Sequence, residues 1–258
     1  MCPIGSRKHS IELKSKAEIA AMRQAGMVAG LALKAAVRAV APGVSTREMD
    51  KVAEQSIRKS GGIPTFIGYR GYPATICVSV NEEVVHGIPG GRKLKPGDVV
   101  GIDIAATVDG FVGDTAVTVI VPPATKEAQK LVDATKRCLD LAIDKMRPGN
   151  RLGDIGAAVQ GYAEANNFGV IRDFVGHGIG RQMHEEPAVP NYGTAGTGMR
   201  LEPGVVLAIE PMITAGDWRV RVLNDGWTVV TEDGSLAAHF EHSIAVTEDG
   251  PLVLTRVD

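Results

Sequence analysis

The chain has 258 residues, of which 44% are hydrophobic and 22% are charged, and its formal net charge is −2. This length allows one large domain or two small ones, and the balance of hydrophobic and charged residues excludes an intrinsically disordered chain. The charge excludes a surface built throughout for nucleic acid, so we expect no nucleic acid as substrate. Three cysteines without a CxxC pair exclude a disulfide framework. The first ten residues lack an apolar core of signal-peptide length, and no uncharged apolar segment approaches the length of a membrane span, so we expect a cytoplasmic protein with no membrane association.

Capping boxes predict the first two helices, after a disordered tail expected over residues 1–10. In Ser15-Lys16-Ala17-Glu18, the hydroxyl and the carboxylate can each satisfy a free amide at a helix start. A long Ala-rich helix is expected to run from there to about Val40. Ser45-Thr46-Arg47-Glu48 repeats the pattern and predicts a second helix that closes near Gly61.

Strands are predicted where β-branched residues alternate with small and polar ones. We expect them over residues 74–80, 99–108 and 111–121, the last two joined as a hairpin around Asp109-Gly110. A third helix is predicted over residues 126–146, where apolar residues recur on one stripe.

Two pairs of similar segments indicate an internal duplication. Residues 41–45 and 147–151 each place a Pro-Gly pair ahead of a helix, and residues 95–103 resemble residues 202–210 at nearly the same offset. We therefore expect one catalytic domain over residues 11–258, made of two related halves at about 11–122 and 123–258.

The duplication superimposes Asp103 on Glu210, and both acids lie in apolar segments. A buried carboxylate is unfavourable unless a metal or another cation compensates it, so this pair is a candidate metal site. Asp114 lies across the predicted hairpin from Asp103, where the two could face each other on paired strands. Glu241 enters the last long predicted strand.

Three histidines have flanks typical of a functional site. His177 lies in a Gly-rich segment that leaves an imidazole uncovered, and His86 and His184 have turn-rich, apolar flanks. The remaining three are expected to be structural: His9, His239 and His242.

Four carboxylates and one imidazole form a hard, oxygen-rich donor set. Such a set suits two divalent ions such as Mn, Fe or Co better than a structural zinc, and it predicts a two-metal hydrolase.

These residues, in this order, resemble the type I methionine aminopeptidases. The likeness extends from about Ile11 to the C-terminus and includes the His86-Gly87-Ile88-Pro89 stretch, the Gly-His-Gly-Ile-Gly stretch around His177, and Cys77 to Glu82. It implies the pita-bread fold, an α+β architecture of two pseudo-symmetric halves with mostly antiparallel sheet and outer helices. The short bacterial form is implied, because no long zinc-binding extension precedes the first helix.

The resemblance also implies a role for each metal ligand. Asp114 and Glu241 would bridge two divalent ions, which could be Co, Mn, Fe or Zn. Asp103 would hold one ion, and His177 with Glu210 would complete the other.

Three catalytic roles and a substrate pocket follow from the same resemblance. Glu210 would shuttle a proton, His184 would polarise the scissile carbonyl, and His86 would assist the leaving nitrogen. The methionine pocket is implied to consist of Tyr69, Tyr72, Cys77 and Trp227. Two positions depart from the family pattern, namely Met183 and Phe66.

The resemblance implies removal of the N-terminal methionine from nascent polypeptides whose second residue is small. A monomer that contacts the ribosome transiently is expected. Two alternatives stay open at this point: a pita-bread peptidase that acts on X-Pro bonds, and a non-catalytic module of the same fold. X-Pro enzymes usually carry an additional N-terminal domain, and non-catalytic modules lose metal ligands.

Overall fold

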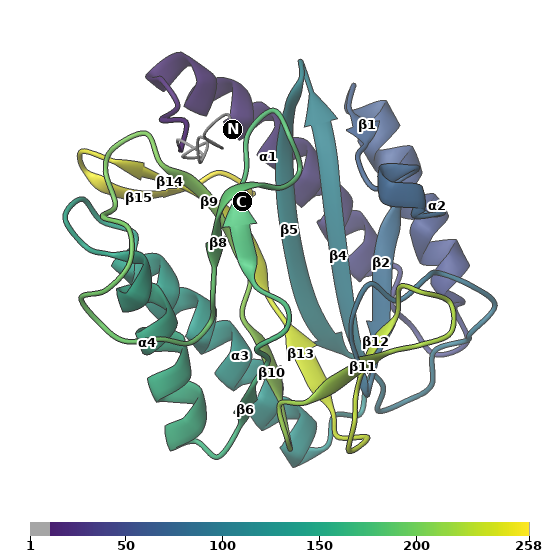
Figure 1. The fold of residues 1–258 in the computed structure, drawn as a ribbon. Helices are drawn as coiled ribbons and strands as arrows, with labels where there is room; N and C mark the ends of the chain where they lie inside the picture. The colour runs from purple at the N-terminus through teal and green to yellow at the C-terminus, as the bar shows by residue number, and fades with distance from the viewer. Residues whose placement is uncertain (1–10, 258) are drawn as a thin grey trace, which may run out of the picture.

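The computed structural model describes residues 11–257, in which a curved antiparallel sheet is covered by helices (Figure 1). The tail expected over residues 1–10, with Cys2 and His9, lies outside the described residues. The expected α+β class, with antiparallel sheet and outer helices, is confirmed. No helix within residues 11–257 combines the length and the apolar character needed to cross a bilayer.

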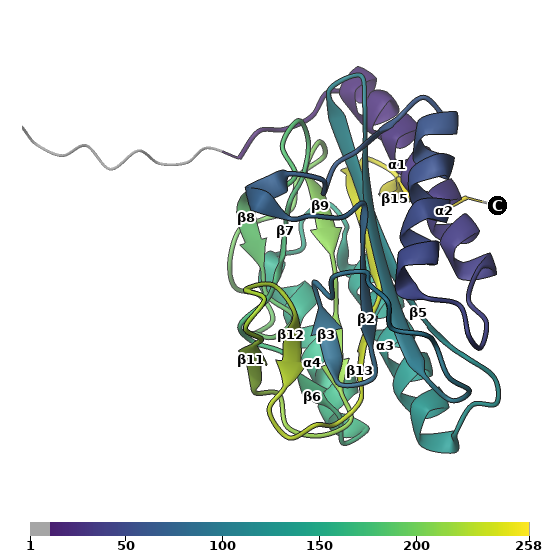
Figure 2. The same cartoon turned by 90° about the vertical axis from the view of Figure 1, so that its right-hand side faces the viewer.

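Four α-helices flank the sheet: α1 (Lys16–Arg38), α2 (Thr46–Lys59), α3 (Lys126–Lys145) and α4 (Leu152–Ala165). Both capping boxes are present, since the Ser15 and Ser45 backbone amides donate to the side chains of Glu18 and Glu48 at 2.9 and 2.7 Å. Figure 2 shows α1 and α2 against one face of the central strands, with shorter strands on the other face.

The main sheet has nine strands in the order β1-β4-β5-β14-β9-β7-β8, with β2 beside β4 and β15 beside β14. Its central hairpin joins β4 to β5 through Asp109 (φ 48°) and Gly110 (φ 77°), the two left-handed residues that a type I′ turn requires. The strands are β1 (Ile63–Pro64), β2 (Ile76–Val80), β4 (Val99–Val108), β5 (Phe111–Ile120), β7 (Gly176–Gly178), β8 (Glu185–Val189), β9 (Val206–Ile209), β14 (Glu241–Thr247) and β15 (Gly250–Val253).

Two three-stranded sheets complete the molecule, in the orders β13-β10-β6 and β11-β12-β3. A 3₁₀ turn, η1 (Tyr69–Gly71), lies between β1 and β2 in the chain. The strands are β3 (Glu83–Val85), β6 (Gly169–Val170), β10 (Met212–Thr214), β11 (Val220–Val222), β12 (Val229–Thr231) and β13 (Ala237–His239).

Matching hydrogen bonds in the two parts of the chain reproduce the sequence repeat. The Gly43 amide donates to the Leu94 carbonyl at 2.8 Å, and the Gly149 amide donates to the Leu201 carbonyl at 3.0 Å. Both glycines are left-handed, with φ of 86° and 93°. The two Pro-Gly turns therefore make the same contact with corresponding segments, each directly after an isolated bridge at Lys93 or Arg200.

Candidate active site

The five predicted metal ligands come from five consecutive strands of the main sheet. Asp103 lies on β4, Asp114 on β5, Glu241 on β14, Glu210 directly after β9, and His177 on β7. All five line one cavity. Residues far apart in the sequence therefore meet because the central strands pair as they do.

The small side chain of Ala116 lies in the middle of this row. In the strand register, Ala116 on β5 is opposite both Asp103 on β4 and Glu241 on β14. Asp114 is opposite Ala105 rather than Asp103, so the two aspartates are diagonal neighbours on one face. The expectation that they share a face is met, but they are not directly opposed.

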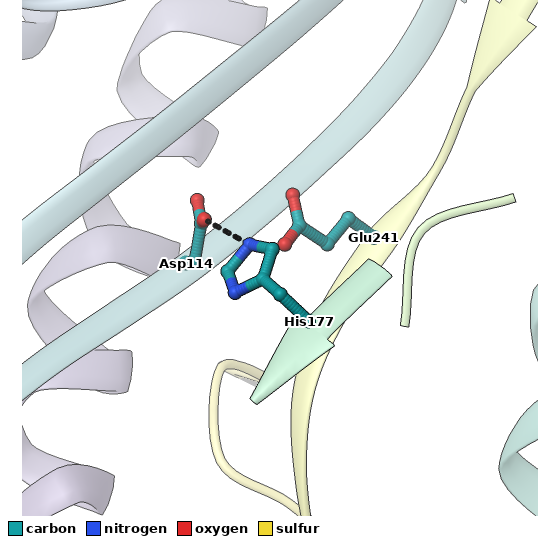
Figure 3. Close-up of side chains that lie close together, drawn as sticks. All are labelled: Asp114, His177 and Glu241. Carbon is teal, nitrogen blue, oxygen red and sulfur yellow. Dashed lines mark ion pairs between the residues drawn. The ribbon is translucent and has the colours of Figure 1, made fainter. Parts of the chain in front are cut away.

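Three of the ligands converge on a single point, as Figure 3 shows for Asp114, His177 and Glu241. One ligand atom from each lies within 4.8 Å of the others. His177 Nε2 is 3.8 Å from Asp114 Oδ2 and 3.6 Å from Glu210 Oε1. Asp114, His177 and Glu241 are all buried.

Three of the four carboxyl groups resist ionisation, and Glu210 does not. Burial raises the pKa of Asp103 to about 7. Burial, reinforced by neighbouring carboxylates, holds the pKa of Asp114 and that of Glu241 well above their usual range. Burial also acts to raise the pKa of Glu210, but the close approach of His239 and His177 brings it below its usual value. Bound cations would favour the ionised form of these carboxyl groups and so offset the cost of burying their charge.

The donor set fits divalent cations. Asp103 Oδ1, Asp114 Oδ1 and Glu241 Oε1 are buried and accept no hydrogen bond. Buried polar atoms in proteins are nearly always paired, so three unpaired oxygens on residues that line one cavity fit a site for cations. The His177 imidazole adds a nitrogen donor beside them.

His239, which we expected to be structural, belongs to the same cluster. Its Nε2 is buried, without a hydrogen bond, 3.5 Å from Glu210 Oε2 and 4.0 Å from Glu241 Oε2. It precedes Glu241 by two residues in extended backbone, a spacing that brings side chains to one face. That spacing was the signal in the sequence. The structural expectation for His242 agrees with its bond to Thr255 Oγ1 at 2.7 Å.

A cavity of about 150 Å³ opens directly from the carboxylates. Tyr72 is buried, and its hydroxyl donates to the carbonyls of Ile76 and Gly87 at 3.0 Å each. The Trp227 ring stands edge-on to Tyr72 with the centroids 5.0 Å apart. The predicted pocket residues and both departures from the family pattern line this cavity: Phe66, Tyr69, Tyr72, Cys77, Met183 and Trp227.

Two further histidines, His86 and His184, line the cavity. The Tyr69 hydroxyl is 2.7 Å from His184 Nδ1, and the two rings are stacked with centroids 5.4 Å apart. His86 is held in a left-handed conformation (φ 61°) with its ring 5.6 Å from that of Phe174. Burial lowers the pKa of His86, which keeps that imidazole neutral near pH 7. Phe174 was not anticipated, since nothing distinguishes it in the sequence from a core aromatic.

The chain matches the model of metallopeptidase family M24 over residues 20–248. It is 48% identical to methionine aminopeptidase 1 of Bacillus subtilis, over 95% of this chain and 98% of that protein. It is equally similar, at 48%, to methionine aminopeptidase 1 of Mycobacterium tuberculosis, over 94% of each chain. The chain belongs to the type I methionine aminopeptidases of family M24. It is thus a metallo-aminopeptidase, and a divalent metal is part of its chemistry.

Solved structures agree with this assignment. Methionine aminopeptidase from Thermotoga maritima superimposes with a TM-score of 0.94 and 46% identity, covering 96% of this chain and all of that one. A prolidase from Pyrococcus furiosus shares the fold alone, with a TM-score of 0.76 and 20% identity over 95% of this chain and 66% of its own. The pita-bread fold expected from the sequence is confirmed.

Proposed function

We propose that this methionine aminopeptidase holds two divalent cations, bridged by Asp114 and Glu241. Asp103 would complete one site, and His177 with Glu210 the other. The unpaired oxygens of Asp103, Asp114 and Glu241 support the arrangement. When bound, such a pair polarises a carbonyl and lowers the pKa of a water so that it can attack near neutral pH. Cobalt, manganese, iron and zinc all suit these donors.

Glu210 is the proposed proton carrier. Its Oε1 faces His177 and its Oε2 faces His239, and these imidazoles favour the ionised carboxylate. An ionised Glu210 can accept a proton from the attacking water and return it to the leaving amine. His86 lines the same cavity and is neutral there, and its proposed role is to contact the leaving nitrogen.

His184 is the proposed donor to the developing oxyanion. Tyr69 donates to its Nδ1 when the proton of the neutral imidazole is on Nε2. That tautomer presents Nε2–H to the cavity, where a donor stabilises the tetrahedral oxygen more than the ground-state carbonyl.

The cavity accounts for the choice of methionine. Its aromatic and sulfur-containing walls suit an unbranched thioether, because sulfur packs well on ring edges. The free amine of the first residue would lie among the carboxylates, so a formylated N-terminus is excluded. The second residue then lies near His86, with space for a small side chain only.

The substrates are the N-termini of nascent polypeptides. We propose a cytoplasmic monomer that contacts the ribosome only transiently, with residues 11–258 as one catalytic domain. The composition and net charge of −2 are consistent with a protein that does not take nucleic acid as substrate.

Anaerobically prepared apo-protein, titrated with each metal on Met-Ala-Ser, tests the proposal. We expect activity to saturate at two equivalents of metal, with strong cleavage of Met-Ala and Met-Gly peptides. Met-Lys, Met-Phe and formylated Met-Ala-Ser should be cleaved weakly or not at all. Equal kcat/KM for Met-Lys and Met-Ala peptides, or preferential cleavage of an X-Pro peptide, would contradict it.

A further inference from the structure

Lys14 is a buried lysine just before α1, outside the cavity. Its side chain is 2% exposed, and Nζ lies 2.9 Å from Glu12 Oε2 and 3.0 Å from Glu185 Oε2. The side chain of Glu12 is largely exposed, whereas that of Glu185 is only 19% exposed. The pair with Glu185 is therefore the shielded one, and it joins the start of the described chain to the first residue of β8.

Glu185 also closes the loop that precedes it. Its Oε1 accepts from the Gln182 amide at 3.1 Å, while Oε2 is held by Lys14. A Cβ at Gly180 would lie 2.6 Å from both Glu185 Oε1 and the Lys14 Cε. Glycine at that position lets the ion pair lie directly against the loop backbone.

This loop, residues 179–184, carries two side chains of the cavity. Met183 is buried in its wall, and His184 directly precedes Glu185. The Tyr69 hydroxyl holds the His184 ring at Nδ1. The Lys14–Glu185 pair fixes the residue that directly follows His184.

We propose that Lys14 is a positioning residue, which acts through Glu185 to set the place of His184 and Met183 during methionine removal. The inference rests on the proposed function of His184. Removing the ammonium group leaves a mostly buried carboxylate without its cation, which favours its movement towards solvent and the release of the Gln182 amide. The loop would then hold His184 less closely.

The side chain is separable from the local fold. The Lys14 backbone amide donates to the Gly204 carbonyl at 2.7 Å, and Ser15 caps α1 on its own. A methionine at position 14 retains the aliphatic stem and both of these contacts. The start of α1 therefore tolerates loss of the charge.

The experiment compares K14M with K16M, a matched change at an exposed lysine two residues along. We expect K14M to bind metal normally yet lose about 10- to 100-fold in kcat/KM for Met-Ala-Ser, as expected when a catalytic group is misplaced. K16M should match the wild type. E185Q should lower kcat/KM in the same direction, and K14M/E185Q should be no worse than K14M.

A second arm separates positioning from stability. In an H184A background, K14M should change kcat by less than about twofold, because the catalytic group that it positions is gone and Met183 contributes to the methionine pocket rather than to the chemical step. An equal loss of kcat with and without His184 would overturn the proposal, as would normal kinetics of K14M. Wild-type protein that does not cleave Met-Ala-Ser would instead contradict the proposed function.

Discussion

Individual carboxyl groups determine how the site can bind metal. Burial raises the pKa of both Asp114 and Glu241, and the negative charge of Asp114 makes ionisation of Glu241 still less favourable. A cation that contacts both relieves this repulsion, so these two residues should bind metal more strongly than any exposed acid. The Asp114 backbone cannot shift to adjust, because its amide donates to Ser243 Oγ at 3.0 Å.

Replacing Asp114 by Asn should therefore abolish turnover and lower metal content. The amide keeps the volume but lacks the negative charge shared by the cations. Metal titration followed by thermal unfolding should raise the Tm of the wild type and of E248Q, an exposed control, but not that of D114N. Full metal content with near-normal kcat in D114N would contradict the bridging role.

Tyr69 provides a second test at this scale. The family resemblance places Tyr69 in the methionine pocket, and in the structure its hydroxyl also forms a hydrogen bond with His184. Y69F keeps the stacked ring and removes only the hydroxyl, so we expect kcat to fall by about tenfold with little change in KM. Y162F, on α4, is the control. A rise in KM at constant kcat would assign Tyr69 to substrate binding alone.

The residues that sequence reasoning could identify are those whose chemistry conflicts with their surroundings. Asp103 and Glu210 stand out because acids are rare in apolar strands. Lys14 does not, because its importance depends on which strands and loops lie next to it. The partners of Lys14 at Glu185 and of Tyr69 at His184 are more than 100 positions away, and no local pattern encodes such contacts.

Among the elements, prediction succeeded where a segment carries its own signal. The capping boxes of α1 and α2 and the turn at Asp109-Gly110 are local devices, and those elements begin or turn where expected. The strands between residues 169 and 239 have only two to five residues each, and apart from β9, whose apolar segment resembles that of β4, they were not predicted. Their pairing partners, rather than a period of their own, make them strands.

The packing of α1 on β5 gives a test of an element. Gly26 of α1 and Gly113 of β5 meet backbone to backbone, and a Cβ at Gly26 would overlap the Leu254 carbonyl. G26A should lower the free energy of unfolding by about 1–3 kcal/mol, despite the better helix propensity of alanine. G161A, in α4 with open space around it, should instead gain about 0.5–1 kcal/mol. Urea unfolding of both variants measures the change in the free energy of unfolding. A G26A variant more stable than the wild type would contradict the close contact between Gly26 and the Leu254 carbonyl.

At the scale of the whole molecule, the site lies between the two related halves. Asp103 and Asp114 come from the first half, and His177, Glu210 and Glu241 come from the second. The halves also pair directly, through β5 and β14. Each has its own core, with α1 and α2 on β2 and β4 in one, and α3 and α4 on β9 in the other.

Removing the metal should therefore lower the free energy of unfolding without unfolding the protein at 25 °C. Ligands that bind only the folded protein stabilise it by about 2.7 kcal/mol at a hundredfold excess over Kd, which corresponds to about 5–10 °C in Tm for a chain of this size. Chelation should lower the Tm by that amount, and readdition of metal should restore it. The helical circular dichroism at 25 °C should not change, because α1 to α4 pack on cores away from the carboxylates. Loss of helical signal on chelation would show that the metals hold the halves themselves, whereas an unchanged Tm would show that the carboxylates bind no cation in the folded protein.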